Sequence, residues 1–305
     1  MEERIGNYTA ARDLYSQSLL VEPSAPTLVA YALLELRHPE GGPAKADAEA
    51  EAEAVNATAV TAGAAVDGPL PVPPPPPSPD LGKVERLFEE ALLIDPRHGP
   101  AYNAYGNTLL RYAPGGADDA RAVYERGVRA DCRDPASVYH GMAMLELSQG
   151  DVAGARETLR RGLDKAERLE QASDNRKRGR AAHLAHTLGM LELNSGRVVD
   201  AGEVFRSGLE RHGNSSQLLL GAALCEVRMG NEYAARKLFQ RAVDADRSHA
   251  QAWQAWGVME MRAGSYKTAK TLLECGIKSA PTHGALWQAY ATMESRKGNF
   301  DVART

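Results

Sequence analysis

The sequence predicts an all-α fold, a right-handed superhelical solenoid built from helix–turn–helix repeats. Glycine recurs at one phase, and the same text returns around it, as in RMGNEYAARKLF at 228–239 and RAGSYKTAKTLL at 262–273. Small and large apolar residues recur in step with the glycines. A period of 34 residues is the length of one helix–turn–helix unit in a stacked array. The glycines that mark the phase are Gly196, Gly230, Gly264 and Gly298.

Residues 215–246 illustrate one repeat. Ser215 or Ser216 is suited to begin a first helix, helix A, because a serine hydroxyl accepts hydrogen bonds from free backbone amides. The apolar run LLLGAALCEVRM follows, and Gly230-Asn231 ends it. Helix B is EYAARKLFQRAVDAD, with apolar residues at helical spacing. Each unit is therefore predicted to be an antiparallel helix pair joined by a glycine turn.

Two columns of helix B residues predict the core. Small residues facing large ones let neighbouring helices approach to about 8–10 Å, so both columns indicate packing rather than ligand contacts. The small column is Ala11, Ala120, Ala155, Ala201, Ala235, Ala269 and Ala303. The large column is Tyr15, Phe88, Tyr124, Leu159, Phe205, Phe239 and Leu273.

The spacing of the large column shows two interruptions of the period. The first, 40–79, is rich in Ala and Glu and ends in a proline run. It offers little apolar surface to bury, so we expect disorder, with the proline run serving as a spacer or as an SH3 or WW ligand.

Met1 aligns in phase with Met293, and we therefore expect the chain to be part of a longer protein. The predicted organisation is 1–39, a partial first repeat and the start of the second; 40–79, the insertion; 80–163, further repeats; 164–180, a charged insertion; and 181–305, regular 34-residue repeats, the last one truncated.

The composition argues against several classes of protein. Cys132, Cys225 and Cys275 are widely spaced with no CxxC pair, which predicts neither a disulfide framework nor a zinc site. His183 and His186 lie three residues apart without an evident third ligand, so we expect no metal site. No stretch has the length of a membrane span. With no catalytic constellation and no phosphate-binding loop, we expect a binding protein without a cofactor rather than an enzyme.

A motif recurs in the last two units. Helix A carries two aromatic residues and then a glutamate, and helix B carries alanine followed by a basic residue. The two instances are Trp253, Trp256, Glu260 and Ala269-Lys270, then Trp287, Tyr290, Glu294 and Ala303-Arg304. In these features the units resemble HAT (half-a-TPR) repeats more than ordinary tetratricopeptide (TPR) repeats.

The resemblance implies a function. HAT proteins serve RNA processing, and the regular step here looks most like the chloroplast HAT factors that protect the 5′ ends of photosystem II mRNAs and aid their translation. It implies single-stranded RNA, an mRNA, as a partner, together with other proteins of an RNA-processing complex. The location that it implies is the chloroplast stroma, with the nucleus as the alternative.

The helix A glutamate and the helix B base stand ten residues apart in five units. We expect a charge-assisted hydrogen bond across the turn of each of these hairpins. Three units lack the pair, and there we expect the hairpin to be held by packing alone. The five pairs are Glu2/Arg12, Glu146/Arg156, Glu226/Arg236, Glu260/Lys270 and Glu294/Arg304. The three departures are Glu35/Glu85, Arg111/Arg121 and Glu192/Gly202.

Two sets of basic residues are candidates for RNA contact. Arg228, Arg262 and Arg296 recur at the 34-residue step and predict a ladder of guanidinium groups, which suit phosphate oxygens. The alternative is that they offset the partial negative charge of a helix C-terminus. The second set is a basic run that predicts either a loop on the RNA backbone or a solvated linker. This run comprises Arg176, Lys177, Arg178 and Arg180.

Charge is distributed unevenly along the chain. Residues 211–305 hold 13 Lys and Arg against 8 Asp and Glu, a net charge of +5, within a chain of net charge −4. The basic part favours an RNA-binding solenoid. The acidic remainder favours a protein–protein scaffold of the nuclear splicing or rRNA maturation type, without direct RNA contact. Trp253 and Trp287 stand one period apart and are predicted to be framework residues rather than base-stacking platforms.

Overall fold

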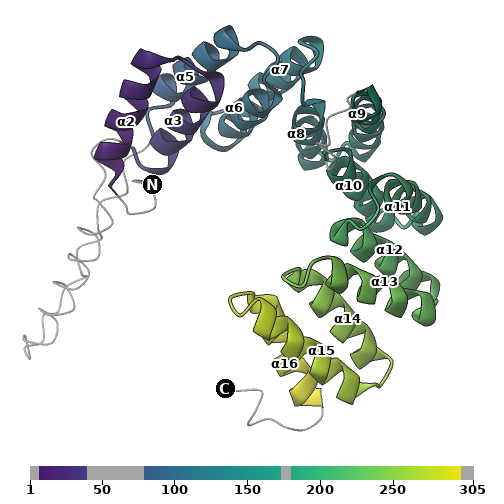
Figure 1. Cartoon of the computed structure of the whole chain (residues 1–305). Coiled ribbons are helices and arrows are strands. Elements are labelled where there is room, and N and C mark those ends of the chain that lie inside the picture. Colours follow the sequence, from purple (N-terminus) through teal and green to yellow (C-terminus); the bar gives the residue numbers. More distant parts are fainter. Residues whose placement is uncertain (1–6, 40–78, 173–179, 297–305) are drawn as a thin grey trace, which may run out of the picture. The chain divides into compact units, whose positions relative to one another are not determined.

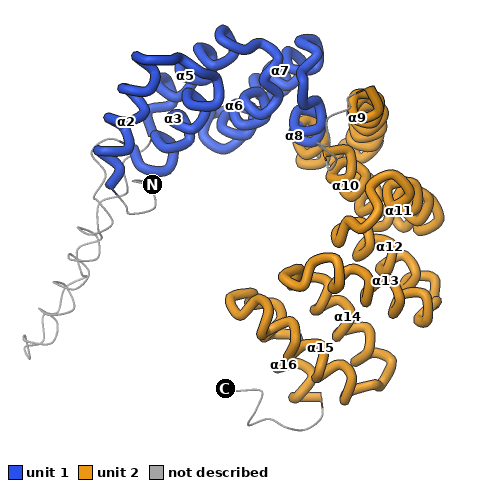
Figure 2. The backbone as a smooth tube through the Cα atoms, in the orientation of Figure 1, with its two compact units in different colours: residues 1–141 blue, residues 142–305 orange. Residues whose placement is uncertain are grey.

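The computed structural model describes residues 7–39, 79–172 and 180–296, and over these ranges every regular element is an α-helix (Figure 1). The chain divides into two compact units, 1–141 and 142–305, and the boundary falls within one helix, α8 (Figure 2). Within each unit, helices that are adjacent in the sequence pack on one another. The predicted all-α helical-repeat solenoid is thereby confirmed.

The described helices alternate between the two types that the repeat predicts. The A helices are α3 (Ala25–Arg37), α6 (Gly99–Tyr112), α8 (Pro135–Ser148), α10 (Arg180–Asn194), α12 (Ser216–Met229), α14 (Ala250–Arg262) and α16 (Gly284–Arg296). The B helices are α2 (Tyr8–Val21), α5 (Leu81–Ile94), α7 (Gly116–Arg129), α9 (Val152–Ala172), α11 (Val198–His212), α13 (Glu232–Ala245) and α15 (Tyr266–Ser279). Ser215, rather than Ser216, is the residue that precedes helix α12, but its side chain forms no capping hydrogen bond.

The two predicted insertions differ in how much of each the structure describes. Of the segment 40–79, residues 40–78 lie outside the described residues, yet the helices on either side of it, α3 and α5, pack together as a pair. The charged segment 164–180 begins as helix, because α9 continues to Ala172 and is 21 residues long. Residues 173–179 lie outside the described residues. A long insertion in a hairpin turn therefore leaves the packing of its two helices in place.

Three of the recurrent glycines end A helices as predicted, and the fourth, Gly298, lies outside the described residues. Gly196, Gly230 and Gly264 have φ of +77°, +81° and +79°, in the left-handed region that glycine adopts without strain. At Gly230 the amide of Asn231 donates to the Glu226 carbonyl at 2.8 Å, and the Gly230 amide donates to the Val227 carbonyl at 3.2 Å. This double closure is the Schellman motif, which satisfies carbonyls left free at a helix end.

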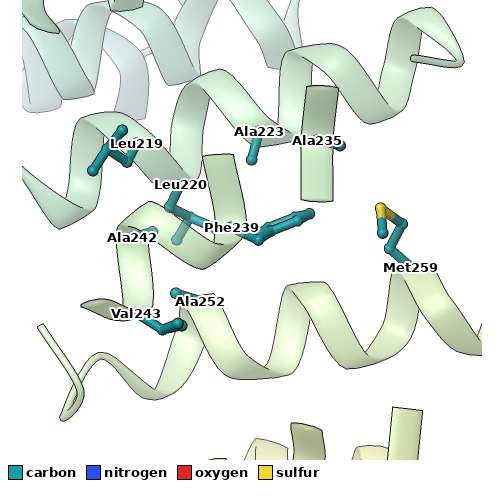
Figure 3. Packing of buried hydrophobic residues seen from close by; sticks show 9 residues of the cluster. All are labelled: Leu219, Leu220, Ala223, Ala235, Phe239, Ala242, Val243, Ala252 and Met259. Carbon is teal, nitrogen blue, oxygen red and sulfur yellow. The ribbon is translucent and has the colours of Figure 1, made fainter. Parts of the chain in front are cut away.

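The core follows the two predicted columns, except that Tyr15 is only partly buried and Ala303 lies outside the described residues. In helix B the side chains of Phe88, Tyr124, Leu159, Phe205, Phe239 and Leu273 are fully buried. Figure 3 shows Phe239 between the helix that carries Leu219 and Ala223 and the helix that carries Ala252 and Met259. Each such ring therefore packs against its own A helix and the next one, which joins successive repeats into one core.

Glycines inside the A helices make room for these rings, a feature that the sequence reasoning missed. A Cβ atom on Gly189 or on Gly221 would overlap the ring of Phe205, and one on Gly106 or Gly141 would overlap the ring of Tyr124. The first glycine of each pair lies in the ring's own repeat and the second in the next. The signal was present in the sequence, because glycine within a helix is unfavourable unless close packing requires it.

We expect Gly230→Val to destabilise the second unit. A β-branched residue resists the left-handed conformation that this turn requires, and the strain is about 1–3 kcal/mol. Thermal unfolding followed by circular dichroism should show a fall of several degrees. Gly230→Asn is the matched control, because asparagine tolerates this conformation, and it should melt closer to the parent. An unchanged melting temperature in the valine variant would contradict the turn assignment.

Candidate functional site

A glutamate sits at the same place near the end of most A helices. Glu192 and Glu260 each lie five residues before the residue that follows the turn glycine, and their backbone carbonyls accept the closing Schellman bonds at 2.9 and 2.8 Å. Their carboxylates are buried, with 0% and 3% of the residue exposed. A buried carboxylate requires a charged or hydrogen-bonding partner, because desolvation of an unpaired charge is costly. The partners of these glutamates therefore define the junctions between repeats.

The partner is a base from the first part of the preceding B helix. Four such pairs occur in the described helices, and we call each of them an inter-repeat clamp. They are Arg12–Glu35 at 3.0 Å, Arg156–Glu192 at 2.9 Å, Arg236–Glu260 at 2.7 Å and Lys270–Glu294 at 3.0 Å.

The expectation that acid and base pair within one hairpin, ten residues apart, is wrong for the pairs of which both members are described; Glu2 and Arg304, which belong to two further pairs, lie outside the described residues. Arg236 pairs with Glu260, 24 residues ahead, and not with Glu226. Lys270 likewise pairs with Glu294 rather than Glu260. The physical reason is that a B helix lies between two A helices that run in the same direction. Its first turn is close to the end of both, and spacing along the chain cannot show which one it contacts.

Two units that were expected to be held by packing alone are held by charge. Glu35 accepts from Arg12 and also from Lys83 Nζ at 3.1 Å. Glu192 is paired with Arg156 and Arg160 of α9, at 2.9 and 3.3 Å, and with Arg197 at 3.3 Å. The additional cations, Lys83, Arg160 and Arg197, do not lie at the helix B position where the base recurs. Comparing residues at that one position of each repeat therefore does not find them.

The clamps hold their cations in the charged form. The hydrogen bond that Arg236 donates to Glu260 is the main cause that raises the pKa of Arg236, and the bond that Lys270 donates to Glu294 does the same for the pKa of Lys270. Both bases thus remain protonated at any physiological pH. A charge-assisted hydrogen bond to a buried acceptor is short and directional, and it sets how one repeat meets the next.

The three arginines of the predicted ladder all lie near the ends of A helices. Arg228, Arg262 and Arg296 occupy the last turns of α12, α14 and α16, and all three are exposed. Arg228 donates from Nη1 to the Leu193 carbonyl of the preceding A helix at 3.3 Å, which is a helix-end contact. Within the described residues, Arg262 and Arg296 form no ion pair.

The second predicted set is only partly described. Arg176, Lys177 and Arg178 lie outside the described residues, and Arg180 is the exposed first residue of α10. His183 and His186 both lie in α10, and the described ranges bring no three metal-binding side chains together. No helix in these ranges is both long and apolar enough to cross a membrane.

The two tryptophans perform the same structural task in successive repeats. The Trp253 indole donates to the Arg247 carbonyl at 2.9 Å, and the Trp287 indole donates to the Pro281 carbonyl at 2.8 Å. Each bond fastens the loop between a B helix and the following A helix. Tyr102 reaches the Pro96 carbonyl from the equivalent place, at 3.1 Å. These contacts fit the predicted framework role.

A groove lies in the second unit between α11 and α13, with α12 as its floor. Its volume is about 610 Å³. Apolar side chains line it, among them Leu209, Met229 and Leu238, and the carboxylate of Glu226 faces it. Cys225 also borders the groove, where burial, and then the nearby Glu226, raise the pKa of its thiol to about 11. That thiol is therefore protonated and a poor nucleophile at neutral pH.

No family model matches the sequence, and the comparison with curated proteins found no match. Solved structures are similar in fold. A tetratricopeptide repeat protein from Parabacteroides merdae ATCC 43184 is 15% identical, with 73% of this chain and 83% of that chain covered and a TM-score of 0.52. A chain of the APC/C hetero-tetramer Cut9-Hcn1 is 14% identical, with 96% of this chain and 47% of that chain covered and a TM-score of 0.52. The fold is thus that of TPR-type helical repeat proteins.

We expect Arg236→Ala to lower the free energy of unfolding by about 1–3 kcal/mol, because it leaves the buried Glu260 carboxylate without its cation. Urea unfolding would measure the change. Adding Glu260→Gln should recover part of the loss, since the neutral amide costs less to bury. The control is Arg129→Ala, which removes an exposed ion pair with Glu125 and should cost under about 0.5 kcal/mol. Equal effects of the two single variants would contradict the clamp.

Proposed function

We propose that the chain binds single-stranded RNA along the arginine ladder of Arg228, Arg262 and Arg296 and acts as an RNA-processing factor. The observation that carries the proposal is the recurrence of an exposed arginine at the end of three successive A helices. Guanidinium groups bind phosphate oxygens in two-point contacts and stack on bases. A row of them at a regular step suits a flexible polyanion.

The clamps strengthen this assignment because they divide the cations of the second unit into two groups. Arg236 and Lys270 are neutralised by the buried Glu260 and Glu294. Arg262 and Arg296, in contrast, have no carboxylate partner in the described part of the chain. Their charge is therefore available to a ligand, in a region whose net charge is +5 over residues 211–305.

The resemblance to HAT repeats supports a particular setting for this binding. A solenoid that covers a single-stranded segment blocks nucleases without catalysing any reaction, so the proposal requires no catalytic residue and no cofactor. By that resemblance we place the protein in the chloroplast stroma, where it would protect or mature an mRNA. The nucleus is the alternative location.

A second candidate function is a scaffold that binds proteins without touching RNA. Two observations favour it. Residues 1–210 carry a net charge of −9, with 23 Lys and Arg against 32 Asp and Glu, which disfavours RNA over that part of the chain. The groove floored by α12 has an apolar lining, which suits a peptide better than a nucleic acid.

The variant Arg228→Ala/Arg262→Ala/Arg296→Ala should bind single-stranded RNA more weakly, by about tenfold or more near 100 mM salt. Three lost phosphate contacts at about 0.7 each should make the slope of log affinity against log salt shallower by about 2. Fluorescence anisotropy titrations with a labelled oligonucleotide at several salt concentrations would measure both quantities. Circular dichroism would check that the variant folds.

The matched control removes the same charge from B helices. Lys237, Lys267 and Lys278 are exposed, and replacing all three by alanine changes the net charge equally. It should leave most of the RNA affinity in place, because these lysines lie outside the ladder. If the two triple variants lose affinity equally, or if the parent does not bind RNA, the ladder is not the RNA-binding surface and the scaffold function is favoured.

A further inference from the structure

The junction between α11 and α12 in the second unit lacks its clamp. At the positions where Arg236 and Lys270 supply the base, 34 and 68 residues earlier in the chain, helix α11 has Gly202. The glutamate that this base would hold is Glu226, in the last turn of α12. Gly202 has no side chain to offer, so the repeat pattern predicts a carboxylate without its cation.

The structure agrees with that prediction. Within the described residues the Glu226 carboxylate accepts one hydrogen bond, from the side-chain amide of Asn231 to Oε2 at 2.8 Å. Among the described residues no cation forms an ion pair with it, whereas four equivalent glutamates are clamped. Its carboxylate is partly exposed and faces the groove rather than being covered.

The absence of a long side chain at position 202 also leaves part of the groove open. A Cβ atom built on Gly202 would meet no other atom within 4 Å. The glycines that sit under core rings behave in the opposite way, because a Cβ on Gly189 or Gly221 would overlap Phe205. Close packing therefore does not explain a glycine at position 202. The space that a clamp arginine would fill is part of the groove, beside Glu226.

The residues that line the groove indicate which kind of ligand would fit there. Glu203 and Glu210 join Glu226 around it, and Arg206 and Arg241 oppose them, so the local charge is negative by one. Apolar surface comes from Val199, which is 69% exposed, and Met229, which is 45% exposed. An arginine side chain combines an apolar stem with a planar cation that binds a carboxylate through two hydrogen bonds.

We propose that this groove, which we call the Gly202 groove, binds a peptide segment of a partner protein that inserts an arginine beside an apolar residue. The arginine would pair with Glu226 and supply in trans the cation that α11 lacks, while the apolar neighbour packs on Val199, Leu209 and Met229. RNA is a poor occupant, because the three glutamates of the lining outnumber its two arginines and the net negative charge disfavours phosphates. The site is independent of the arginine ladder.

The test is selection of peptides from a displayed random heptapeptide library on the full chain, with Gly202→Arg as the comparison protein. Gly202→Arg should pair with Glu226 within the chain, raise the melting temperature and close the groove. We expect the parent to enrich peptides that contain arginine next to an apolar residue, and Gly202→Arg to bind those peptides at least tenfold more weakly. Replacing the arginine of a selected peptide by neutral citrulline should cause a similar loss.

Two further variants keep the proposal falsifiable if Gly202→Arg misfolds. Glu226→Gln removes the carboxylate with little change of shape and should weaken the selected peptides at least tenfold, while Gly202→Ala leaves the groove open and should stay within twofold of the parent. Selection that yields no peptides, peptides without a basic residue, or peptides indifferent to Glu226→Gln overturns the proposal. The proposal is also overturned if the parent forms a dimer and Gly202→Arg dissociates it, because the occupant of the groove is then a second copy of the chain. Single-stranded RNA affinity should be unchanged in Gly202→Arg, which separates this outcome from that of the ladder.

Discussion

The clamped repeat junctions depend on one interaction, the ion pair between the glutamate buried near the end of helix A and a base of the preceding B helix. A residue such as Glu260 acts at two levels. Its backbone carbonyl accepts a hydrogen bond from the Ser265 amide at 2.8 Å, which closes the glycine turn of its own hairpin. Its carboxylate accepts a hydrogen bond from the guanidinium of Arg236 in the preceding repeat. Local turn geometry therefore fixes the position of the charge, and the charge fixes the neighbouring helix. A substitution that alters the turn should therefore also disturb the junction between repeats.

Such a clamp contributes orientation more than net stability. Burying a carboxylate and a guanidinium costs much of what their attraction returns, so an apolar contact of the same size would stabilise the junction about as well. An apolar contact, however, tolerates sliding, whereas two bonds to Arg236 Nε and Nη2 at 2.7 and 3.1 Å do not. The rings of Phe205 and Phe239 supply the bulk of the buried surface, and the clamp sets the register in which they meet the A helices.

How much could be predicted from the sequence differs between the fold and the site. A fixed phase of glycine and alternating small and large residues predict helices, turns and core, because these follow from local geometry and from spacing within one repeat. Which A helix a base such as Arg236 contacts is not local, since both flanking A helices present a glutamate at the same height. The extra cations on Glu192 were missed for a related reason. Arg160 and Arg197 stand at other phases of the repeat, and only the packed helices bring them to one carboxylate.

A departure from a repeated pattern says more about binding than the pattern itself does. Residues that recur in several units serve the stacking that those units share, as Glu260 and Trp253 do. Gly202 breaks the column, and neither of the usual reasons for glycine in a repeat applies to it: it lies inside a helix rather than at a turn, and no ring packs on it. Glycine inside a helix is unfavourable by about 1 kcal/mol relative to alanine, and neither a turn nor close packing compensates for this at Gly202, where the space is open to the proposed ligand. The unclamped Glu226 beside that space gives the chemistry of what enters, a cation on a slender stem.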